Sequence, residues 1–554
     1  MRKNKLGKMI LGAEIGNCVH VAGPIHFLDL AREEGYQTIF LGGAVDIEVL
    51  FAKIEELRPD IVAIGYRLTL RSAEALLLEV RKRRERLSYN PEWCFGGTKP
   101  VADLARREGY FSFVSDGYDD VSDSLRYLRG MGVVESKRVY QDNLLERIHE
   151  IAPYPLIRHH FGRPLLEETI QGIGKIAEAG VLDVISLGPD QNAQQFFFHP
   201  ERMKPEFDGA GGVPIRTVDD LKALKTASQK GNYPLMRCYS GTEDVFDCAK
   251  LLLETINNAW AAVPLCWYNE MDGRGTRKLE TSLCEAQALI RWHAQKGVPV
   301  EINEPHHWGL RDAHDVIPVA MAYISALNAK HMGVKHYIAQ YMFNNPQGLS
   351  FSMDFAKILA MIELVESLVD KDFHVYRETR AGLALFNADA NVAKGQLAAS
   401  TFMQMAVKPQ IVHVVGFCEA DHAANADEVI ESCKIVRGVI RQTLGEKFSM
   451  EQDDRVLERK NELISEAKIL LSFIEEMYSE YDNPLTNPEV LADCIKKGFI
   501  DAVHIKKNEK FRGILRTKLE KGMCLACDEN GNTMTEQERL QKLLRNHQYR
   551  CRIG

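Results

Sequence analysis

The chain has 554 residues, of which 45% are hydrophobic, and it carries a formal net charge of −8 with a pI near 6.1. A chain of this length exceeds what one hydrophobic core can organise, so two or three domains are expected. The mild acidic excess excludes a broad basic surface for nucleic acid, and no apolar run approaches the roughly 20 residues of a membrane span, so we expect neither as a partner.

Two features favour a cytoplasmic protein. The apolar run that begins at Met9 is interrupted by Glu14, which makes it too short for a signal-peptide core. The 12 cysteines are scattered, which is typical of reduced thiols rather than of a disulfide framework. Cys524 and Cys527 form a Cys-x-x-Cys pair without a second pair at zinc-ribbon spacing, and the Cys-x-x-x-Cys-x-x-Cys motif of radical iron–sulfur enzymes is absent.

The N-terminal segment alternates short apolar stretches with amphipathic ones. Strands are expected at residues 9–15, 38–41, 61–66, 93–95 and 111–114. Helices are expected between them, at residues 24–34, 46–57, the stretch before 85, and 101–108. Strands this apolar, separated by helices, predict a parallel sheet covered on both faces. Such sheets bind ligands at the carboxyl ends of their strands, where we expect His20, Tyr66 to Leu68, and Gly96 with Gly97.

This domain resembles the cobalamin-binding domain of B12-dependent mutases and methionine synthase. That family carries Asp-x-His-x-x-Gly after its first strand, Ser-x-Leu after its third and Gly-Gly after its fourth. The matching residues here are His20, Gly23, Leu68, Gly96 and Gly97, while Cys18 stands at the Asp position and Tyr66 at the Ser position.

The resemblance implies that His20 is the lower ligand of the cobalt of cobalamin, since imidazole nitrogen suits cobalt. It implies cofactor-binding roles for Gly23, Tyr66, Leu68, Gly96 and Gly97. In the family, the Asp would hydrogen-bond the imidazole nitrogen that does not bind cobalt and so orient the ring. Cys18 stands in its place here and changes that support. A flavodoxin-like domain with an incidental loop histidine is the alternative.

A second alternating series follows a charged segment. Strands are expected to begin near residues 183, 213, 235, 263, 300, 337, 375 and 411. Helices are expected at residues 218–228, 243–255, 282–296, 313–331, 353–369 and 423–443. Eight strands at a mean spacing of about 33 residues predict a (β/α)₈ TIM barrel. A further strand at residues 156–159 leaves the first barrel strand open.

The fold class is therefore α/β, with a flavodoxin- or Rossmann-like B12-binding domain followed by a TIM barrel and a small α+β tail. The expected boundaries are residues 1–131 for the cobalamin-binding domain, 132–155 for a linker, 156–444 for the barrel and 445–554 for a helical and mixed tail.

Polar side chains are crowded after the expected barrel strands, at the end where barrel enzymes carry their active sites. The candidate catalytic residues are Arg237, for an anionic substrate group, and Glu304 and Tyr341, for hydrogen bonds to substrate or adenosine. The candidate substrate-binding residues are Asp190, Asn192, Arg237, Asn303, His306, Gln340 and Asn344. Each of these could instead cap a helix or order a loop. Adjacent His306 and His307 would rarely face one ion, so no metal is expected there.

From about residue 262 to 364, the chain is similar to the barrel subunit of methylaspartate (glutamate) mutase. The matches, in the family's order, are Leu279-Glu280, Ser282, Gly297-Val298, Ile302-Asn303, Glu304-Pro305, Gly333-Val334-Lys335 and Tyr341. The family holds both substrate carboxylates with several arginines. Here Gln194 stands near the place of one, and Arg237 is four residues before Gly241 instead of in register.

Together the resemblances imply an adenosylcobalamin-dependent radical isomerase, a carbon-skeleton mutase with its two subunits fused, acting on a small polar, carboxylate-bearing substrate. In that family, breakage of the cobalt–carbon bond gives a radical that takes a hydrogen atom from the substrate. A corrinoid methyltransferase and a non-catalytic cobalamin-binding protein are the alternatives. The expected partners are a small-molecule substrate and a second copy of the chain, because homodimers are the commonest oligomers.

Overall fold

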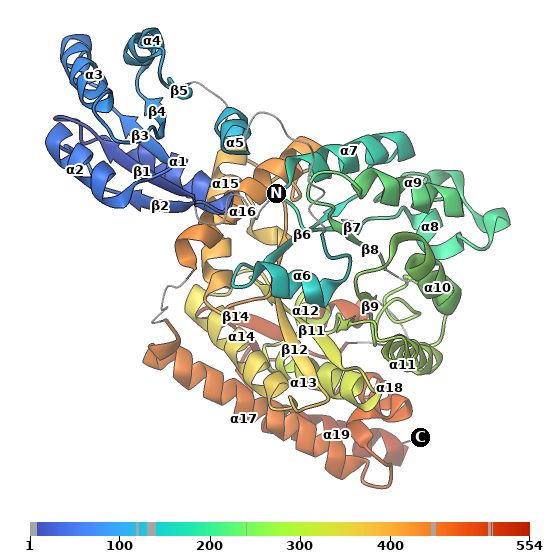
Figure 1. Cartoon of the computed structure of the whole chain (residues 1–554). Helices are drawn as coiled ribbons and strands as arrows, with labels where there is room; N and C mark the ends of the chain where they lie inside the picture. Colours follow the sequence, from blue (N-terminus) through green and yellow to red (C-terminus); the bar gives the residue numbers. More distant parts are fainter. Residues whose placement is uncertain are drawn as a thin grey trace. The chain divides into compact units, whose positions relative to one another are not determined.

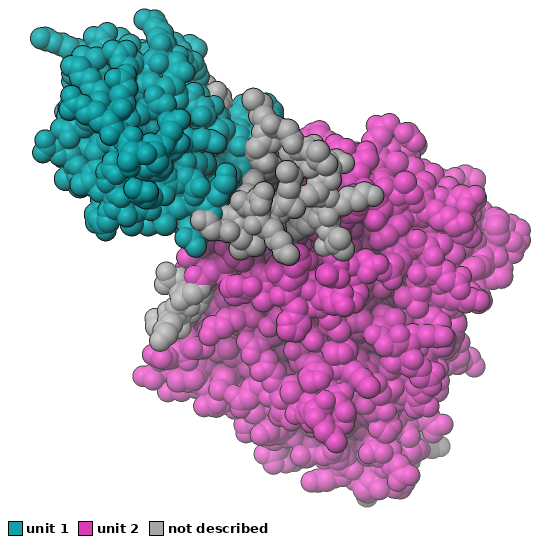
Figure 2. Space-filling view, in the orientation of Figure 1, with its two compact units in different colours: residues 1–139 teal, residues 140–554 magenta. Residues whose placement is uncertain are grey.

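The computed structural model describes residues 8–117, 121–129, 140–239, 241–444, 450–507, 511 and 513–553. The chain forms two compact units, residues 1–139 and 140–554 (Figures 1 and 2). The expected linker, residues 132–155, lies partly outside the described residues, and its remainder contains the helix α6 (Leu144–Ile151). None of the described helices is both long and apolar enough to cross a membrane.

The first unit is a five-stranded parallel sheet in the order β2-β1-β3-β4-β5, which confirms the predicted α/β domain. Its strands are β1 (Met9–Glu14), β2 (Gln37–Phe40), β3 (Ile61–Gly65), β4 (Glu92–Gly96) and β5 (Phe113–Ser115). Its helices are α1 (Ala22–Glu33), α2 (Ile47–Leu57), α3 (Leu70–Arg84), α4 (Lys99–Arg107) and α5 (Val121–Arg129). This strand order is the flavodoxin type, in which ligands bind where the order reverses, between β1 and β3.

Apolar residues on both faces of this sheet explain its buried position between helices. All five residues of β3 are buried, and β1 is buried from Ile10 onward. Trp93 of β4 is fully buried and packs against Phe51 of α2, with ring centroids 5.9 Å apart. Near-continuous apolar strands are typical of parallel sheets covered on both faces. Polar residues that could bind a ligand are therefore expected in the loops at the strand ends.

The second unit holds eight parallel strands in the order β8-β7-β6-β13-β12-β11-β10-β9. They are β6 (Leu156–Phe161), β7 (Val184–Leu187), β8 (Leu235–Arg237), β9 (Ala261–Val263), β10 (Val300–Ile302), β11 (His336–Phe343), β12 (His374–Ala381) and β13 (Ile411–Val414). Over the described residues, β8 and β9 are the two edges of this sheet, so the barrel is nearly closed. This arrangement agrees with the expected TIM-like barrel.

One expected barrel strand was wrong. The first strand is β6 at Leu156, and Val213 forms only an isolated bridge with Pro189. Val213 lies between Gly212 and Pro214, and a proline cannot donate a hydrogen bond to a neighbouring strand. The segment therefore closes the loop after β7 instead of joining the sheet.

Helices surround the barrel, and a further layer covers part of them. The barrel helices are α7 (Leu166–Ala179), α8 (Gln191–Phe196), α9 (Val218–Ser228), α10 (Val245–Ile256), α11 (Leu279–Gln295), α12 (Pro305–Gly309), α13 (Val316–His331), α14 (Phe351–Glu366), α15 (Ala390–Met405) and α16 (Ala426–Thr443). The tail comprises α17 (Asp454–Met477), α18 (Pro488–Lys496), the hairpin β14 (Thr517–Glu520) and β15 (Met523–Ala526), and α19 (Glu536–Ile553). Short 3₁₀ turns lie at Pro200–Arg202, Pro205–Phe207, Leu383–Leu385, Met450–Gln452, Pro484–Thr486 and Val503–Lys507. Helix α17 packs on α13, α14 and α19 (Figure 1), so the tail extends the barrel core.

Candidate functional site

The loop after β1 presents an exposed imidazole at the carboxyl edge of the first sheet. Gly16 turns the chain with a positive φ of 66°, a conformation that favours glycine. The carbonyl of Cys18 then accepts a hydrogen bond from the backbone of Ala44, at 2.7 Å, which ties the loop to the one after β2. Cys18 is fully buried, whereas His20 is exposed. The loop therefore fixes the backbone on both sides of a solvent-facing histidine.

A thiol and a carboxyl group lie beneath this imidazole. Sγ of Cys18 is 3.6 Å from Nδ1 of His20, and the thiol is also hydrogen-bonded to Glu14. Glu14, the last residue of β1, is 2% exposed, and burial raises its pKa to about 7. A Cβ atom at Gly65 on the neighbouring strand would lie 2.6 Å from Oε1 of Glu14, so only glycine leaves room for the carboxyl group.

The two ring nitrogens of His20 have different surroundings. Nδ1 faces Cys18, while Nε2 has no hydrogen-bond partner among the described residues. A ring anchored at one nitrogen and free at the other has the arrangement of a metal-ligating histidine. Here a thiol backed by a carboxyl group occupies the place of the usual carboxylate partner.

The neighbouring loop after β3 supports the His20 loop from below. Tyr66 is 1% exposed, and its hydroxyl donates to Oδ1 of Asn17 at 3.1 Å. Leu68 and Val19 are 38% and 66% exposed. Tyr66 thus orders the loop, and the apolar surface available at this edge comes from Leu68 and Val19.

The three predicted glycines have different roles. A Cβ atom at Gly23 or Gly96 would meet nothing within 4 Å, so the backbone there borders open space. A Cβ atom at Gly97 would lie 2.7 Å from the carbonyl oxygen of Tyr66. Glycine at this position therefore allows the loops after β3 and β4 to approach each other. Open backbone beside a free imidazole nitrogen fits a large, flat ligand bound over the sheet edge.

In the barrel, fully buried Glu301 of β10 is the centre of a charged network. Its Oε2 pairs with Nη2 of Arg237 at 2.9 Å. Its other donors are Arg158 at 3.4 Å, Trp260 at 2.7 Å, Asn303 at 2.9 Å and Gln340 at 2.8 Å. The structure therefore brings together three predicted site residues, Arg237, Asn303 and Gln340, in the barrel interior.

Glu378 of β12 is the second carboxyl group of this network. Its Oε1 is 2.7 Å from Nη1 of Arg158, and Gln340 donates to the same oxygen at 3.2 Å. Its Oε2 has no partner among the described residues. Burial raises the pKa of Glu378 to about 7. Two arginines and two carboxyl groups thus form a nearly neutral, hydrogen-bonded cluster. We call this cluster, Arg158, Arg237, Glu301 and Glu378, the floor of the site.

Basic side chains gather near the carboxyl ends of β6, β12 and β13, and we call this group the opening because barrel strands end there at the mouth of the barrel. Arg380 of β12 is half-buried, and its guanidinium has no carboxylate partner among the described residues. Burial and nearby arginines hold the pKa values of four histidines well below the usual range, so the imidazoles are neutral; they are His160, His306, His307 and His413. An unpaired guanidinium among neutral hydrogen-bonding rings can bind a small anion.

Glu304 and Tyr341 lie outside this cluster. Oε1 of Glu304 accepts hydrogen bonds from the backbone of Leu265 and Cys266, and its Oε2 accepts from Trp308 at 3.0 Å. Tyr341 is packed in the apolar layer between the barrel and its helices, on the face of β11 opposite Gln340.

Two predicted substrate-binding residues order loops through their side chains, and a third contributes a backbone hydrogen bond. Asp190 begins α8 by accepting from the backbone of Ala193, and it pairs with Arg216. The side chain of Asn192 bonds to the backbone of Lys204 at both ends. The backbone of Asn344 donates to Asp354 at 2.5 Å.

His306 lies at the opening, with Nδ1 unpartnered among the described residues.

Sequence reasoning missed Arg158, His160, Glu378, Arg380 and His413. The first two follow from the strand at Leu156, which was not counted in the barrel. Glu378 and Arg380 alternate along β12, and charged residues at alternate positions of a barrel strand point into its interior. That alternation was the signal available in the sequence.

A cavity of about 650 Å³, including space open to solvent, lies beside the edge strand β9 and is also lined by the segment that follows β8. Its lining is mostly apolar and includes Tyr239, whose ring centroid is 5.0 Å from the guanidinium carbon of Arg237. Gln194, Thr242, Tyr268 and Arg277 supply its polar groups.

No protein-family model and no curated protein matches this chain. Among solved structures, a cobalamin-binding protein from Desulfitobacterium hafniense is 21% identical over 23% of this chain and 59% of its own length, with a TM-score of 0.18. A Rubisco-like protein from Rhodopseudomonas palustris is 10% identical over 56% of this chain and 70% of its own, with a TM-score of 0.32. The cobalamin-dependent S-adenosylmethionine radical enzyme OxsB, with aqua-cobalamin bound, is 11% identical over 79% of this chain and 57% of its own, with a TM-score of 0.17.

This chain thus spans less than two thirds of the length of the first and third of these proteins. The fold described above does not depend on these low similarities.

Proposed function

We propose that this protein is an adenosylcobalamin-dependent isomerase, a carbon-skeleton mutase of the methylaspartate mutase type, acting on a small carboxylate. The observation that carries the proposal is the His20 loop, with an exposed imidazole whose Nδ1 contacts Cys18 and whose Nε2 is free. It lies at the strand-order reversal of a flavodoxin-type sheet, where such folds bind cofactors.

Five residues of the first unit would hold the cofactor. Nε2 of His20 would ligate cobalt. The open backbone at Gly23 and Gly96 would allow close approach of the cofactor, and exposed Leu68 and Val19 would cover apolar parts of the corrin. When bound, adenosylcobalamin supplies an organic radical for hydrogen-atom abstraction.

The barrel would bind and orient the substrate. Arg380 would pair with a substrate carboxylate, because it is the half-buried arginine of the opening without a carboxylate partner among the described residues. His160, His306 and His413 would donate or accept hydrogen bonds as neutral rings.

Arg237 is assigned a supporting role. Its guanidinium pairs with Glu301 and lies 4.8 Å from the ring of Trp260, so its charge is already neutralised. It would hold the floor of the site, with Gln340 and Asn303 bonded to the same carboxylate. Glu304 would shape the loop after β9.

The test is reconstitution of the full chain in the dark with adenosylcobalamin, followed by incubation with a panel of small mono- and dicarboxylates. The expected result is isomerised product by nuclear magnetic resonance with at least one acid, lost in His20→Ala and in Arg380→Gln. Methyl transfer from methylcobalamin to a thiol, with no reaction of adenosylcobalamin, would instead establish the methyltransferase alternative. Binding of cobalamin without turnover of either form would establish a non-catalytic binding protein.

A further inference from the structure

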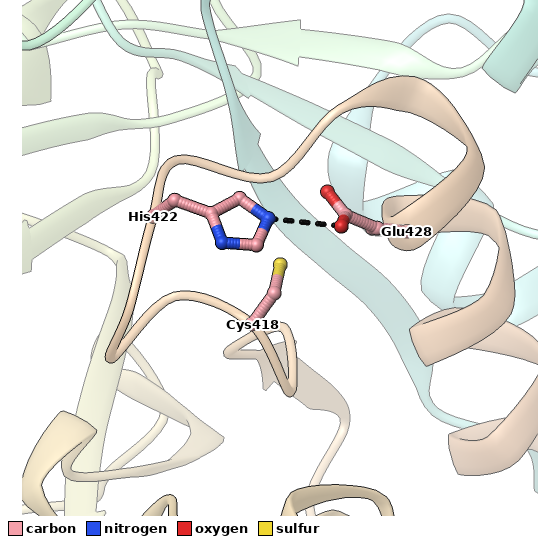
Figure 3. Close-up of side chains that lie close together, drawn as sticks. All are labelled: Cys418, His422 and Glu428. Carbon is pink, nitrogen blue, oxygen red and sulfur yellow. Dashed lines mark hydrogen bonds and ion pairs between the residues drawn. The ribbon is translucent and has the colours of Figure 1, made fainter. Parts of the chain in front are cut away.

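The loop between β13 and α16 gathers three side chains of metal-binding type. They are Cys418, His422 and Glu428, and their ligand atoms lie within 4.8 Å of one another. In Figure 3, the sulfur of Cys418 points toward the gap between the imidazole and the carboxylate. Cys418 is buried, Glu428 is half-buried, and the His422 side chain is 50% exposed.

The local backbone explains this convergence. The amides of Asp421 and His422 both donate to the carbonyl of Cys418 at 2.9 Å, so the chain turns back and brings the imidazole over the thiol. Glu428 lies in the first turn of α16, whose N-cap is Asn425. The backbone of Asn425 donates to Oε2 of Glu428 at 2.8 Å, which leaves Oε1 directed at His422.

The imidazole is oriented as in metal sites. Nδ1 of His422 is 2.9 Å from Oδ2 of Asp421, and Nε2 is 2.9 Å from Oε1 of Glu428. Metal-ligating histidines almost always use their second nitrogen for such a carboxylate partner, which fixes the ring and raises its basicity. The thiol of Cys418 is hydrogen-bonded to Glu428, so all three possible ligand groups are directed at one point.

We propose that Cys418, His422 and Glu428 bind one Zn²⁺ ion through sulfur, nitrogen and oxygen, with a fourth position open to water or substrate. This mixed donor set suits zinc, and three protein ligands with an open position are typical of catalytic zinc. Ligand atoms around tetrahedral zinc are about 3.5 Å apart, so the site closes with a shift of about 1 Å or less.

The site lies at the carboxyl end of β13, the end of the barrel that carries the charged opening. Glu419 of the same loop is 3.7 Å from fully buried His159 of β6. The proposal does not rest on cobalamin binding, because all its ligands belong to the barrel unit.

The test uses the full chain, treated with a chelator and free of cobalamin, and titrated with Zn²⁺ or Co²⁺ alone. We expect one equivalent of Zn²⁺ to bind with a dissociation constant of about 1 μM or lower. Co²⁺ should give the near-ultraviolet charge-transfer band of a thiolate ligand. Cys418→Ser and His422→Ala should each weaken binding at least about 100-fold, and Asp421→Asn about 10-fold.

The matched control is Cys284→Ser, which removes the exposed cysteine of α11 and should leave zinc affinity unchanged. Unfolding midpoints measured in chelator show whether each variant is folded before metal is added. Unchanged affinity in Cys418→Ser, or a wild-type Co²⁺ spectrum without the thiolate band, would overturn the proposal; the spectrum requires no variant.

Discussion

Sγ of Cys18 lies 3.6 Å from Nδ1 of His20, and the same thiol is hydrogen-bonded to the buried carboxyl group of Glu14. The exposed imidazole is thus supported through sulfur instead of directly by a carboxylate. A thiol is a weak hydrogen-bonding group, so it orients the ring while adding little to its basicity. This relationship leads to separate expectations for Cys18 and for Glu14.

Replacing Cys18 by alanine should weaken cobalamin binding about tenfold, because the ring of His20 loses its inner contact. Titration of the full chain with aquacobalamin, followed by absorbance, measures this change. The control is Cys94→Ala, which removes a buried thiol of β4, the second strand from β1 in the sheet, and should lower stability alone. Equal affinities for wild type and Cys18→Ala would show that the thiol does not support the ligand.

Glu14 should make the first unit less stable as pH rises. Its pKa is raised to about 7 in the folded chain from a usual value of 4.5, so its favourable contribution is complete below pH 4.5 and is lost as pH rises through 7. At pH 8 the cost is up to about 3 kcal/mol, and Glu14→Gln should remove it. Urea unfolding followed by hydrogen exchange in β1 peptides tests this; a variant no more stable than wild type at pH 8 would refute it.

Arg380→Gln should weaken binding of small carboxylates, because the half-buried guanidinium is the unpaired cation of the opening among the described residues. The loss should be about 100-fold in affinity, which corresponds to one charge-assisted hydrogen-bonded pair at roughly 2 to 3 kcal/mol. Thermal stabilisation by a carboxylate panel provides the readout. Arg377→Gln is the control on the same strand, since Arg377 pairs with Glu366 on the helix-facing side, and it should retain carboxylate binding.

Arg237→Met should destabilise the barrel by about 3 kcal/mol or more, because it leaves the buried carboxylate of Glu301 short of a partner. Glu301→Gln should also destabilise it, because Arg237 loses its carboxylate partner while Arg158 keeps only Glu378. The double variant should lose less than the sum of the two, with a coupling of about 1 to 3 kcal/mol. Strict additivity in denaturant unfolding would mean that the two side chains do not stabilise each other.

The alternation of apolar strands and helices predicted both α/β units, since this pattern depends on local sequence. The strand at Leu156 was also expected, but nine candidate strands for eight barrel positions left the first barrel strand open, and local sequence does not show which candidate joins the sheet. The segment at Val213 was wrongly predicted as a strand because it is short and apolar. In the structure it closes a loop and forms only an isolated bridge.

The candidate site was predictable only in part. His20 and the glycines follow strands directly, so their place at the sheet edge could be inferred from chain order. The pairing of Arg237 with Glu301 joins residues 64 positions apart, and only the curvature of the nearly closed barrel brings them together. Likewise, Cys418, His422 and Glu428 match no metal-binding spacing considered in the sequence, and the loop backbone creates their proximity.

The most direct test of the central claim, that Nε2 of His20 is the lower ligand of cobalt, is electron paramagnetic resonance of the full chain bound to cob(II)alamin. Protein labelled with ¹⁵N-histidine is compared with unlabelled protein. We predict that the nitrogen splitting of the cobalt signal changes from a triplet to a doublet on labelling, and that His20→Ala abolishes this change. A triplet that persists in the labelled protein would show that the ligand is not a histidine of this chain, and would contradict the account.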